Sequence, residues 1–105
     1  MSIVIVQGSF SVAPEERDQF LAASVDSMVN SRAEAGCIEY VLAADPIDPG
    51  RVVLSERWES MEHLDRHLEG LRAARAASGG QPANRPTPTS QEIMLFDVSS
   101  ARPLG

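Results

Sequence analysis

The chain contains no lysine, so its nine basic residues are all arginine. Fifteen aspartate and glutamate residues outnumber them, and the formal net charge is −6 at pH 7. An acidic surface repels the phosphate backbone of nucleic acids and the headgroups of anionic lipids. We therefore expect no nucleic-acid partner and no membrane partner. The arginine bias and alanine-rich runs such as residues 72–77 are typical of a GC-rich bacterial genome.

Cysteine occurs once, as Cys37, which excludes an internal disulfide and a metal cluster built from cysteines. No apolar run approaches the roughly 18 residues that cross a bilayer. The first residues lack the basic region of a signal peptide, so we expect a cytoplasmic protein. A length of 105 residues fits one domain, residues 1–105, with a modest core.

Residues 3–12 alternate in hydrophobicity and predict a first strand, in which Gly8 indicates a bulge or a close approach. A helix follows, since Pro14 suits a first turn and Gly36 predicts an end after about Ala35. One face of this strand is apolar and carries Val4, Val6, Phe10 and Val12. The other face is mixed and carries Ile3, Ile5, Gln7, Ser9 and Ser11. The helix is predicted to bury a stripe of Leu21, Val25 and Met28.

Two further strands are predicted at residues 37–44 and 51–59, and the turn between them pairs them as a hairpin. Ser60 is a suitable N-cap for a second helix, which ends at Gly79 and Gly80. The order strand–helix–strand–strand–helix–strand predicts an α+β sandwich. The remaining expectations are a core row of Ile38, Tyr40 and Leu42, a flexible loop at 81–88, a last strand at 91–98 and a loose tail at 100–105.

Glu56 lies in the same row of the third strand as Leu54 and Trp58, so its carboxylate is predicted to be buried. A buried carboxylate needs a partner, and Arg32 falls on the apolar stripe at the end of the first helix. Two interpretations remain open at this point. One is a structural role, either an ion pair between Arg32 and Glu56 or a helix C-cap, and the other is a pocket wall that orients a polar substrate.

His67 lies three residues after Leu64 and four before Leu71, at the edge of the buried stripe of the second helix. Such a histidine is either a core side chain with a satisfied hydrogen bond or an acid, base or donor in a pocket. His63 precedes it by four residues and faces further towards solvent. This spacing can bind zinc, but no third ligand accompanies the pair, so we expect no metal.

Several segments at these spacings together resemble the antibiotic biosynthesis monooxygenase family. They are VAPEERDQFL (12–21), SRAEAGCIEY (31–40), DPIDPGRVVLSERWES (45–60) and HLDRHLEGL (63–71). The resemblance covers about residues 3–99. It implies a ferredoxin-like βαββαβ sandwich, with an antiparallel sheet and two helices on one face, that pairs with a second copy as a dimeric α/β barrel. It also implies a pocket between the helices and the sheet.

The same resemblance implies a cofactor-independent monooxygenase that oxidises a quinol or polycyclic phenol with dioxygen. Such a reaction needs a base or donor that stabilises the phenolate, and an apolar, water-poor cavity. We accordingly assign His67 as the base or donor. The substrate-binding residues are predicted to be Trp58 and Tyr40 as pocket walls, Gln7 as an orienting amide, and Ser9, Arg32 and Glu56 as further polar contacts.

Other branches of the family leave alternatives. In the haem-degrading branch, an asparagine, a tryptophan and a haem-ligating histidine stand where this chain has Gln7, His67 and Ala77, so the resemblance does not extend to haem chemistry. A non-oxidative isomerase or lyase of the same family remains open. So does a non-catalytic dimer that binds a small ligand, because a fold by itself does not select an activity.

Overall fold

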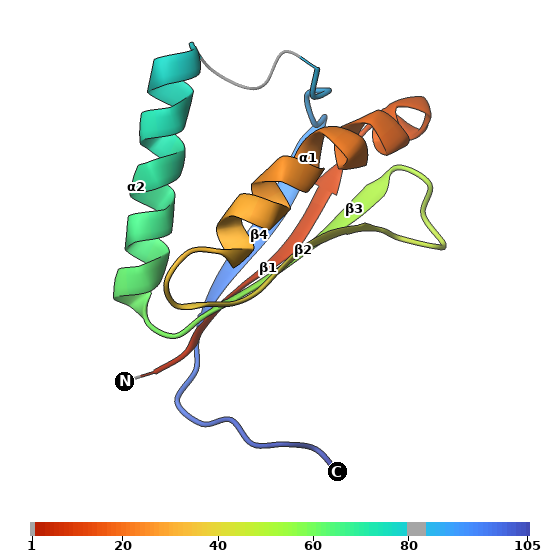
Figure 1. Cartoon of the computed structure of the whole chain (residues 1–105). Coiled ribbons are helices and arrows are strands. Elements are labelled where there is room, and N and C mark those ends of the chain that lie inside the picture. The colour runs from red at the N-terminus through yellow and green to blue at the C-terminus, as the bar shows by residue number, and fades with distance from the viewer. Residues whose placement is uncertain (1, 80–83) are drawn as a thin grey trace.

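The computed structural model describes residues 2–79 and 84–105, and these form an α+β fold (Figure 1). The predicted strands agree with the observed ones to within a residue at most ends, whereas the first helix stops before the predicted Ala35. Gly80 lies outside the described residues. The elements are β1 (Val4–Ser11), a 3-10 turn η1 (Pro14–Glu16), α1 (Arg17–Arg32), β2 (Cys37–Ala44), β3 (Arg51–Trp58), α2 (Met61–Ser78) and β4 (Ser90–Asp97).

The four strands form one antiparallel sheet in the order β2-β3-β1-β4. The two central strands are therefore β3 and β1, and they pair with Val4 opposite Trp58 and Phe10 opposite Val52. Side chains from α1 and α2 pack against the same face of these strands. This is the ferredoxin-like arrangement that the sequence predicts.

The core fills the space between the helices and this covered face of the sheet. The alternation of the strands places every second residue of β1, β2 and β3 there. The buried apolar side chains are Val4, Val12, Phe20, Tyr40, Leu42, Val52, Leu54, Trp58 and Leu64. The opposite face of the sheet has no helix over it among the described residues, and we call it the open face.

Helix α1 is rotated relative to the predicted stripe, of which Leu21 and Met28 pack against the core but Val25 does not. Phe20 and Ser24 are fully buried, whereas Val25 is exposed. Ser24 can be buried because its hydroxyl donates a hydrogen bond of 2.7 Å to the carbonyl of Phe20. Phe20 sets the rotation of the helix, since its ring packs 5.7 Å from the ring of Phe10 on β1.

Strand β2 also departs from the predicted pattern, because its pairing with β3 is irregular between Cys37 and Glu39. Ile38 occupies that irregularity and is exposed instead of joining Tyr40 and Leu42 in the core. A β-bulge has this effect, since one extra residue shifts the following side chains relative to the partner strand.

Two glycines are required by close approach. A Cβ on Gly8 would collide with the backbone of β4 at Glu92, which confirms the close approach predicted for this position. Gly36 has a φ of +82°, and a Cβ there would also collide with the ring of His63. It lies in the turn after α1, where the left-handed conformation reverses the chain into β2.

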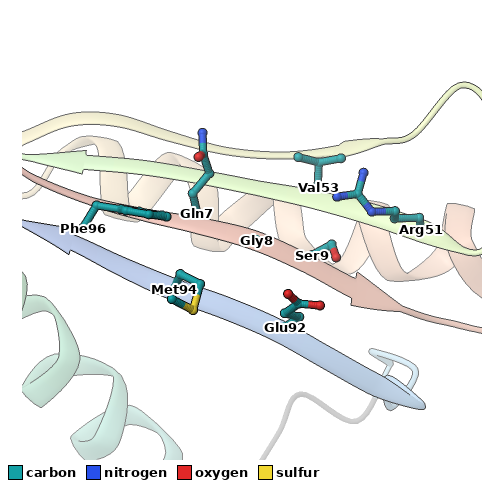
Figure 2. Close-up of a pocket in the computed structure, with 8 residues that line it drawn as sticks. All are labelled: Gln7, Gly8, Ser9, Arg51, Val53, Glu92, Met94 and Phe96. Atoms are coloured by element: carbon teal, nitrogen blue, oxygen red, sulfur yellow. The ribbon is translucent and has the colours of Figure 1, made fainter.

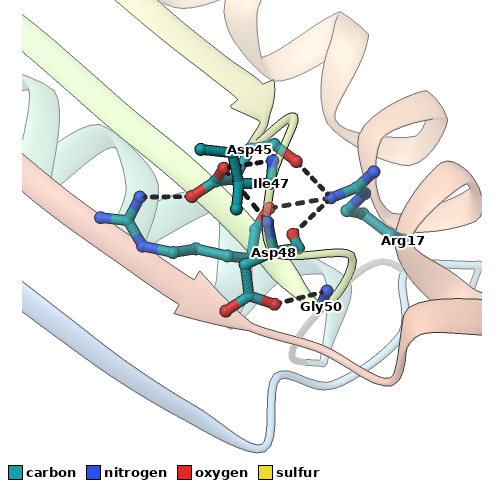
Figure 3. Close-up of polar contacts among 6 residues, drawn as sticks. Arg17, Asp45, Ile47, Asp48 and Gly50 are labelled. Atoms are coloured by element: carbon teal, nitrogen blue, oxygen red, sulfur yellow. Dashed lines mark hydrogen bonds and ion pairs between the residues drawn. The ribbon is translucent and has the colours of Figure 1, made fainter.

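The turn between β2 and β3 is held by polar contacts that the sequence did not reveal (Figure 3). Arg17 at the start of α1 donates from Nη1 to the carbonyls of Asp45 and Asp48, at 2.9 and 2.8 Å. The Asp45 carboxylate accepts hydrogen bonds from the Ile47 N–H and from Arg51. The Ile47 N–H, followed by the Arg51 side chain, lowers the pKa of Asp45.

The sequence predicts a flexible loop at 81–88, but the described part of this segment packs against the core before β4 begins. The guanidinium of Arg85 lies 4.4 Å from the centre of the Phe20 ring, and Pro86 is buried. Residues 81–83 of the predicted loop lie outside the described residues. In the tail after β4, the residues from 98 to 105 have no regular secondary structure. No described helix is long and apolar enough to cross a membrane.

Candidate functional site

His67 lies at the centre of the helix–sheet interface, with only 2% of its surface exposed. The first turn of α2 aims it there, because Ser60 caps the helix by accepting a hydrogen bond from the His63 N–H. The Nδ1 atom of His67 lies 2.8 Å from Oε2 of Glu34, in the turn after α1. A carboxylate on Nδ1 holds the proton on that nitrogen, which leaves Nε2 available to accept or pass on a proton.

Two aromatic rings enclose this imidazole. The centre of the Trp58 ring lies 4.7 Å from that of His67, and the Tyr40 ring meets it edge-on at 5.4 Å. Burial raises the pKa of Tyr40 to about 12, so its phenol stays protonated at neutral pH. The Ser31 side chain offsets this rise only in part. The structure therefore brings together three of the predicted site residues.

Glu56 is the fourth predicted residue in this cluster, and 6% of its surface is exposed. Its Oε1 accepts a hydrogen bond of 3.0 Å from the indole N–H of Trp58. Burial raises the pKa of Glu56, and the Trp58 hydrogen bond and the nearby His67 offset this only in part. The carboxylate is thus held in a place where its charged form is costly.

Two cavities flank the cluster. One lies between α1 and α2, has a volume of about 320 Å³, and is lined by Glu34, His67 and Leu71 among others. The second lies between α2 and the sheet, with a volume of about 220 Å³. We call it the Glu56 cavity, because Glu56 is its charged lining residue. Its apolar lining consists of Val6, Met61, Leu64, Leu68, Ile93, Met94 and Leu95.

The predicted buried pair of Arg32 and Glu56 is wrong. Arg32 is exposed at the end of α1, and its Nε donates to the backbone carbonyl of Tyr40 at 2.8 Å. The prediction failed because it placed Arg32 on a stripe with Val25, whereas the helix is rotated to bury Phe20 and Ser24. Arg32 acts as a link between α1 and β2.

Gln7 and Ser9 are also in a different place from the other predicted site residues. Successive side chains of a strand point to opposite faces, so both residues project from β1 onto the open face. There they line a shallow cavity of about 390 Å³ with Gly8, Arg51, Val53, Glu92, Met94 and Phe96 (Figure 2). The sheet itself separates them from His67, and grouping them with it in one pocket was wrong.

Glu34 and His63 show what sequence reasoning missed. Glu34 lies within a block that carries the family resemblance, but its contact with His67 joins residues 33 positions apart and has no local signal. The Nδ1 atom of His63 lies 2.7 Å from the Ser60 hydroxyl. His63 therefore does not turn towards Glu34, which is the residue that contacts His67. Within the described ranges, no group of three or more His, Cys, Asp or Glu side chains could hold a metal ion.

Comparison with protein families decides the relationship. The family model of antibiotic biosynthesis monooxygenases matches residues 3–78, which include both helices and the first three strands. This chain belongs to the antibiotic biosynthesis monooxygenase family. The matched region contains His67, Glu34, Trp58 and Glu56, so the whole cluster lies within the family domain.

Two relatives of this family member each match a little under two thirds of the chain. An uncharacterized protein of Synechocystis sp. is 30% identical over 66 residues, which are 63% of this chain and 45% of the relative. The chain thus spans less than half of that protein. A Bacillus subtilis protein named "Putative monooxygenase YcnE" is 28% identical over 67 residues, which are 64% of this chain and 70% of the relative.

Solved structures share the fold of this family member along nearly its whole length. A protein from Deinococcus radiodurans superposes with a TM-score of 0.75 at 22% identity, covering 97% of this chain and 98% of the other. One from Chloroflexus aurantiacus has a TM-score of 0.70 at 25% identity, covering 99% and 100%. Both are described as a "putative antibiotic biosynthesis monooxygenase". The fold is therefore that of the family.

Proposed function

We propose that this protein is a cofactor-independent monooxygenase that oxidises a quinol or a polycyclic phenol with dioxygen. Membership of the monooxygenase family makes a monooxygenase-like role the starting point. The observation that carries the finer proposal is the His67–Glu34 pair, in which His67 is buried against the ring of Trp58 and both residues line the cavity between the helices. A phenol needs such a group, because it gives up electrons far more readily once it has lost its proton.

The residues of the cluster suit this chemistry. Glu34 keeps the imidazole of His67 in one orientation, so its other nitrogen is placed to exchange a proton with the substrate or with reduced oxygen. Trp58 supplies a flat wall on one side of that imidazole. The surrounding apolar side chains exclude water, which strengthens every charge interaction within the site.

The reaction balances without an added reductant. For a phenol with a free ring C–H, one atom of dioxygen enters the ring as a carbonyl oxygen and the other leaves as water. The substrate loses the phenolic hydrogen and the ring hydrogen, and both end in that water molecule. All four electrons that reduce dioxygen come from the substrate, which becomes a quinone.

We further propose that a second copy of this chain covers the open face, as the family resemblance implies. Two large apolar side chains on that face, Met94 and Phe96, are 54% and 45% exposed in the single chain. An antiparallel sheet of this size with a partly apolar second face gains stability when a partner sheet packs on it. The partners are thus a small aromatic substrate, dioxygen and an identical chain.

Oxygen uptake on a panel of quinols and polycyclic phenols tests the activity. His67→Ala should lower turnover about 10²–10⁴-fold, because it removes a positioned proton donor or acceptor. Added imidazole should restore part of the rate, since it can occupy the vacated space beside Glu34. His63→Ala is the matched control on the same helix, and it should change turnover less than twofold.

Other outcomes identify other functions. Full activity in His67→Ala would remove His67 from the mechanism. Conversion of a small ketone without oxygen uptake would identify an isomerase or lyase of the same family. A ligand that raises the melting temperature without being converted would identify a binding protein, because ligand that binds only the folded state stabilises it.

A further inference from the structure

The Glu56 carboxylate is a buried charged group of the covered face that has a single hydrogen-bond donor. Among the described residues, its only hydrogen bond is the one that Trp58 donates to Oε1. Oε2 therefore has no protein partner, although the residue is nearly fully buried and borders a cavity. In the part of the chain that the structure describes, the fully buried side-chain atom without a partner is Arg85 Nε, so Oε2 of Glu56 keeps some accessible surface and can accept a hydrogen bond from a molecule in the cavity.

The other ionisable groups around Glu56 do not supply that donor. Tyr40 pairs with it across β2 and β3, but within the described residues the Glu56 carboxylate accepts from Trp58 and not from the Tyr40 hydroxyl. His67 on α2 is close enough to affect its charge, yet Nδ1 of that imidazole is held by Glu34. The Glu34 carboxylate only adds repulsion. The remaining direction, towards the cavity, is the one from which a ligand can approach.

We propose that Glu56 is the general base of the reaction and that the Glu56 cavity holds the ring of a neutral phenolic substrate, whose hydroxyl donates to Oε2. This inference rests on the proposed function and assigns the two proton transfers of the reaction to different residues. Glu56 removes the proton from the substrate, and His67 with Glu34 becomes the proton donor to reduced oxygen.

The proton transfers balance over one cycle. Glu56 takes the hydroxyl proton, the phenolate passes electrons to dioxygen, and a bond forms between a ring carbon and one oxygen atom. Protonated His67 gives its proton to the outer oxygen of the resulting peroxide. Loss of the ring hydrogen as a proton then breaks the O–O bond, and the outer oxygen, which already carries the proton from His67, takes the proton held by Glu56 and leaves as water. The ring proton returns to His67, so both residues regain their starting states.

The position of Glu56 also sets the class of ligand. Burial raises its pKa, so it is a stronger base than a solvent-exposed glutamate. Glu34 adds a second negative charge nearby. Carboxylic acids are therefore repelled, whereas a neutral molecule with an apolar body and one weakly acidic hydroxyl fits an apolar lining with one acceptor.

Binding can be measured independently of turnover. Trp58 is the only tryptophan, so its fluorescence reports ligands beside Glu56. We expect 2-naphthol to bind at least tenfold more tightly than 2-methoxynaphthalene, which lacks the donor, and than 2-naphthoate, which is anionic. Leu68→Phe should abolish naphthol binding by filling the Glu56 cavity. Leu71→Phe, one turn away, fills the cavity between the helices instead and should leave binding within twofold.

The catalytic role has its own measurement. Glu56→Gln keeps an oxygen for the Trp58 hydrogen bond but removes the base, so kcat for oxygen uptake should fall at least 100-fold while naphthol still binds. In the unmodified protein, kcat should fall as the pH drops through the raised pKa of Glu56, and this acidic limb should vanish in Glu56→Gln. Glu59→Gln, an exposed neighbour, is the control.

The two proposals fail in different ways. If no phenol is oxidised but naphthol binds with the expected preferences, the oxygenase proposal fails and the binding site stands. If phenols are oxidised but Glu56→Gln keeps both its rate and its acidic limb, Glu56 is not the base. Binding that Leu71→Phe abolishes and Leu68→Phe spares would likewise overturn the placement of the ligand.

Discussion

Glu56 and Glu39 lie on neighbouring strands of one sheet but on its two opposite faces. On the open face, Glu39 accepts hydrogen bonds from Ser55 at 2.7 Å and from Arg57 at 3.3 Å. The Ser55 hydroxyl is the main cause of its lowered pKa, and Arg57 contributes. On the covered face, Glu56 has one donor, and burial raises its pKa.

This contrast separates a structural carboxylate from a reactive one. Glu39 has a partner on each oxygen, so its charged form is the stable form and it has little tendency to take up a proton. Glu56 keeps an open oxygen in an apolar place, where its charged form is destabilised. The same residue type therefore has opposite roles, because the alternation of the strand assigns it to one face or the other.

The largest predicted effect is loss of the dimer, and it should follow from a charged substitution on the open face. Val53 lies in the middle of this face, and Val53→Asp places a charge where we expect a partner sheet. The variant should be monomeric at micromolar concentrations at which the unmodified protein is a dimer, as measured by sedimentation equilibrium. Val29→Asp replaces a valine on α1 that is 60% exposed, and it should leave the dimer intact. An unmodified protein that stays monomeric at every concentration would refute the dimer.

The pH dependence of stability should reveal the raised pKa of Glu56 on the covered face. Because the pKa of Glu56 is raised above its ordinary value of 4.5, the folded state binds its proton more tightly than the unfolded state. This contribution to stability is present at low pH and is lost as the pH rises through the raised pKa. Glu56→Gln should therefore melt at a higher temperature than the unmodified protein at pH 8, and the difference should shrink towards pH 5. A difference that does not change with pH would show that Glu56 titrates normally.

The smallest predicted effect is the loss of stability when Glu39 on the open face is replaced. Its lowered pKa gives stability that is present above 4.5 and is lost as the pH falls through the folded value. This is the opposite direction to Glu56. The pair with Arg57 is partly exposed, so Glu39→Gln should cost less than about 1 kcal/mol at pH 7. Urea denaturation at fixed protein concentration measures it, and a loss of several kcal/mol would mean that Glu39 is buried in an interface.

Local signals in the sequence predicted the elements well. Alternation revealed the strands, Ser60 marked the start of α2, and Gly36 and Gly79 marked reversals of the chain with positive φ. Burial of Glu56 and Trp58 in one row also followed from alternation, and it is confirmed. These features depend on neighbours a few residues apart, so a single sequence contains them.

Rotation and register were harder to predict. The stripe of α1 was assigned from large side chains, but Ser24 is small enough to let the helix approach the sheet and can satisfy its own hydroxyl. The bulge at Ile38 shifted a residue out of the core. Both errors have the same cause. The buried face of an element is selected by packing against elements far away in the sequence, and the hydrophobicity of a single segment does not predict that packing.

By itself, the sequence determined the order of the elements, the acidic surface and, outside the irregularity at Ile38, the alternation of the strand residues between the two faces. Only the tertiary structure decided that Glu34 meets His67, that Arg32 leaves Glu56 without a counter-ion, and that Gln7 lies behind the sheet. The physical reason is distance along the chain. Secondary structure is set by contacts within a few residues, whereas a site depends on how separate elements rotate and pack until their polar groups meet.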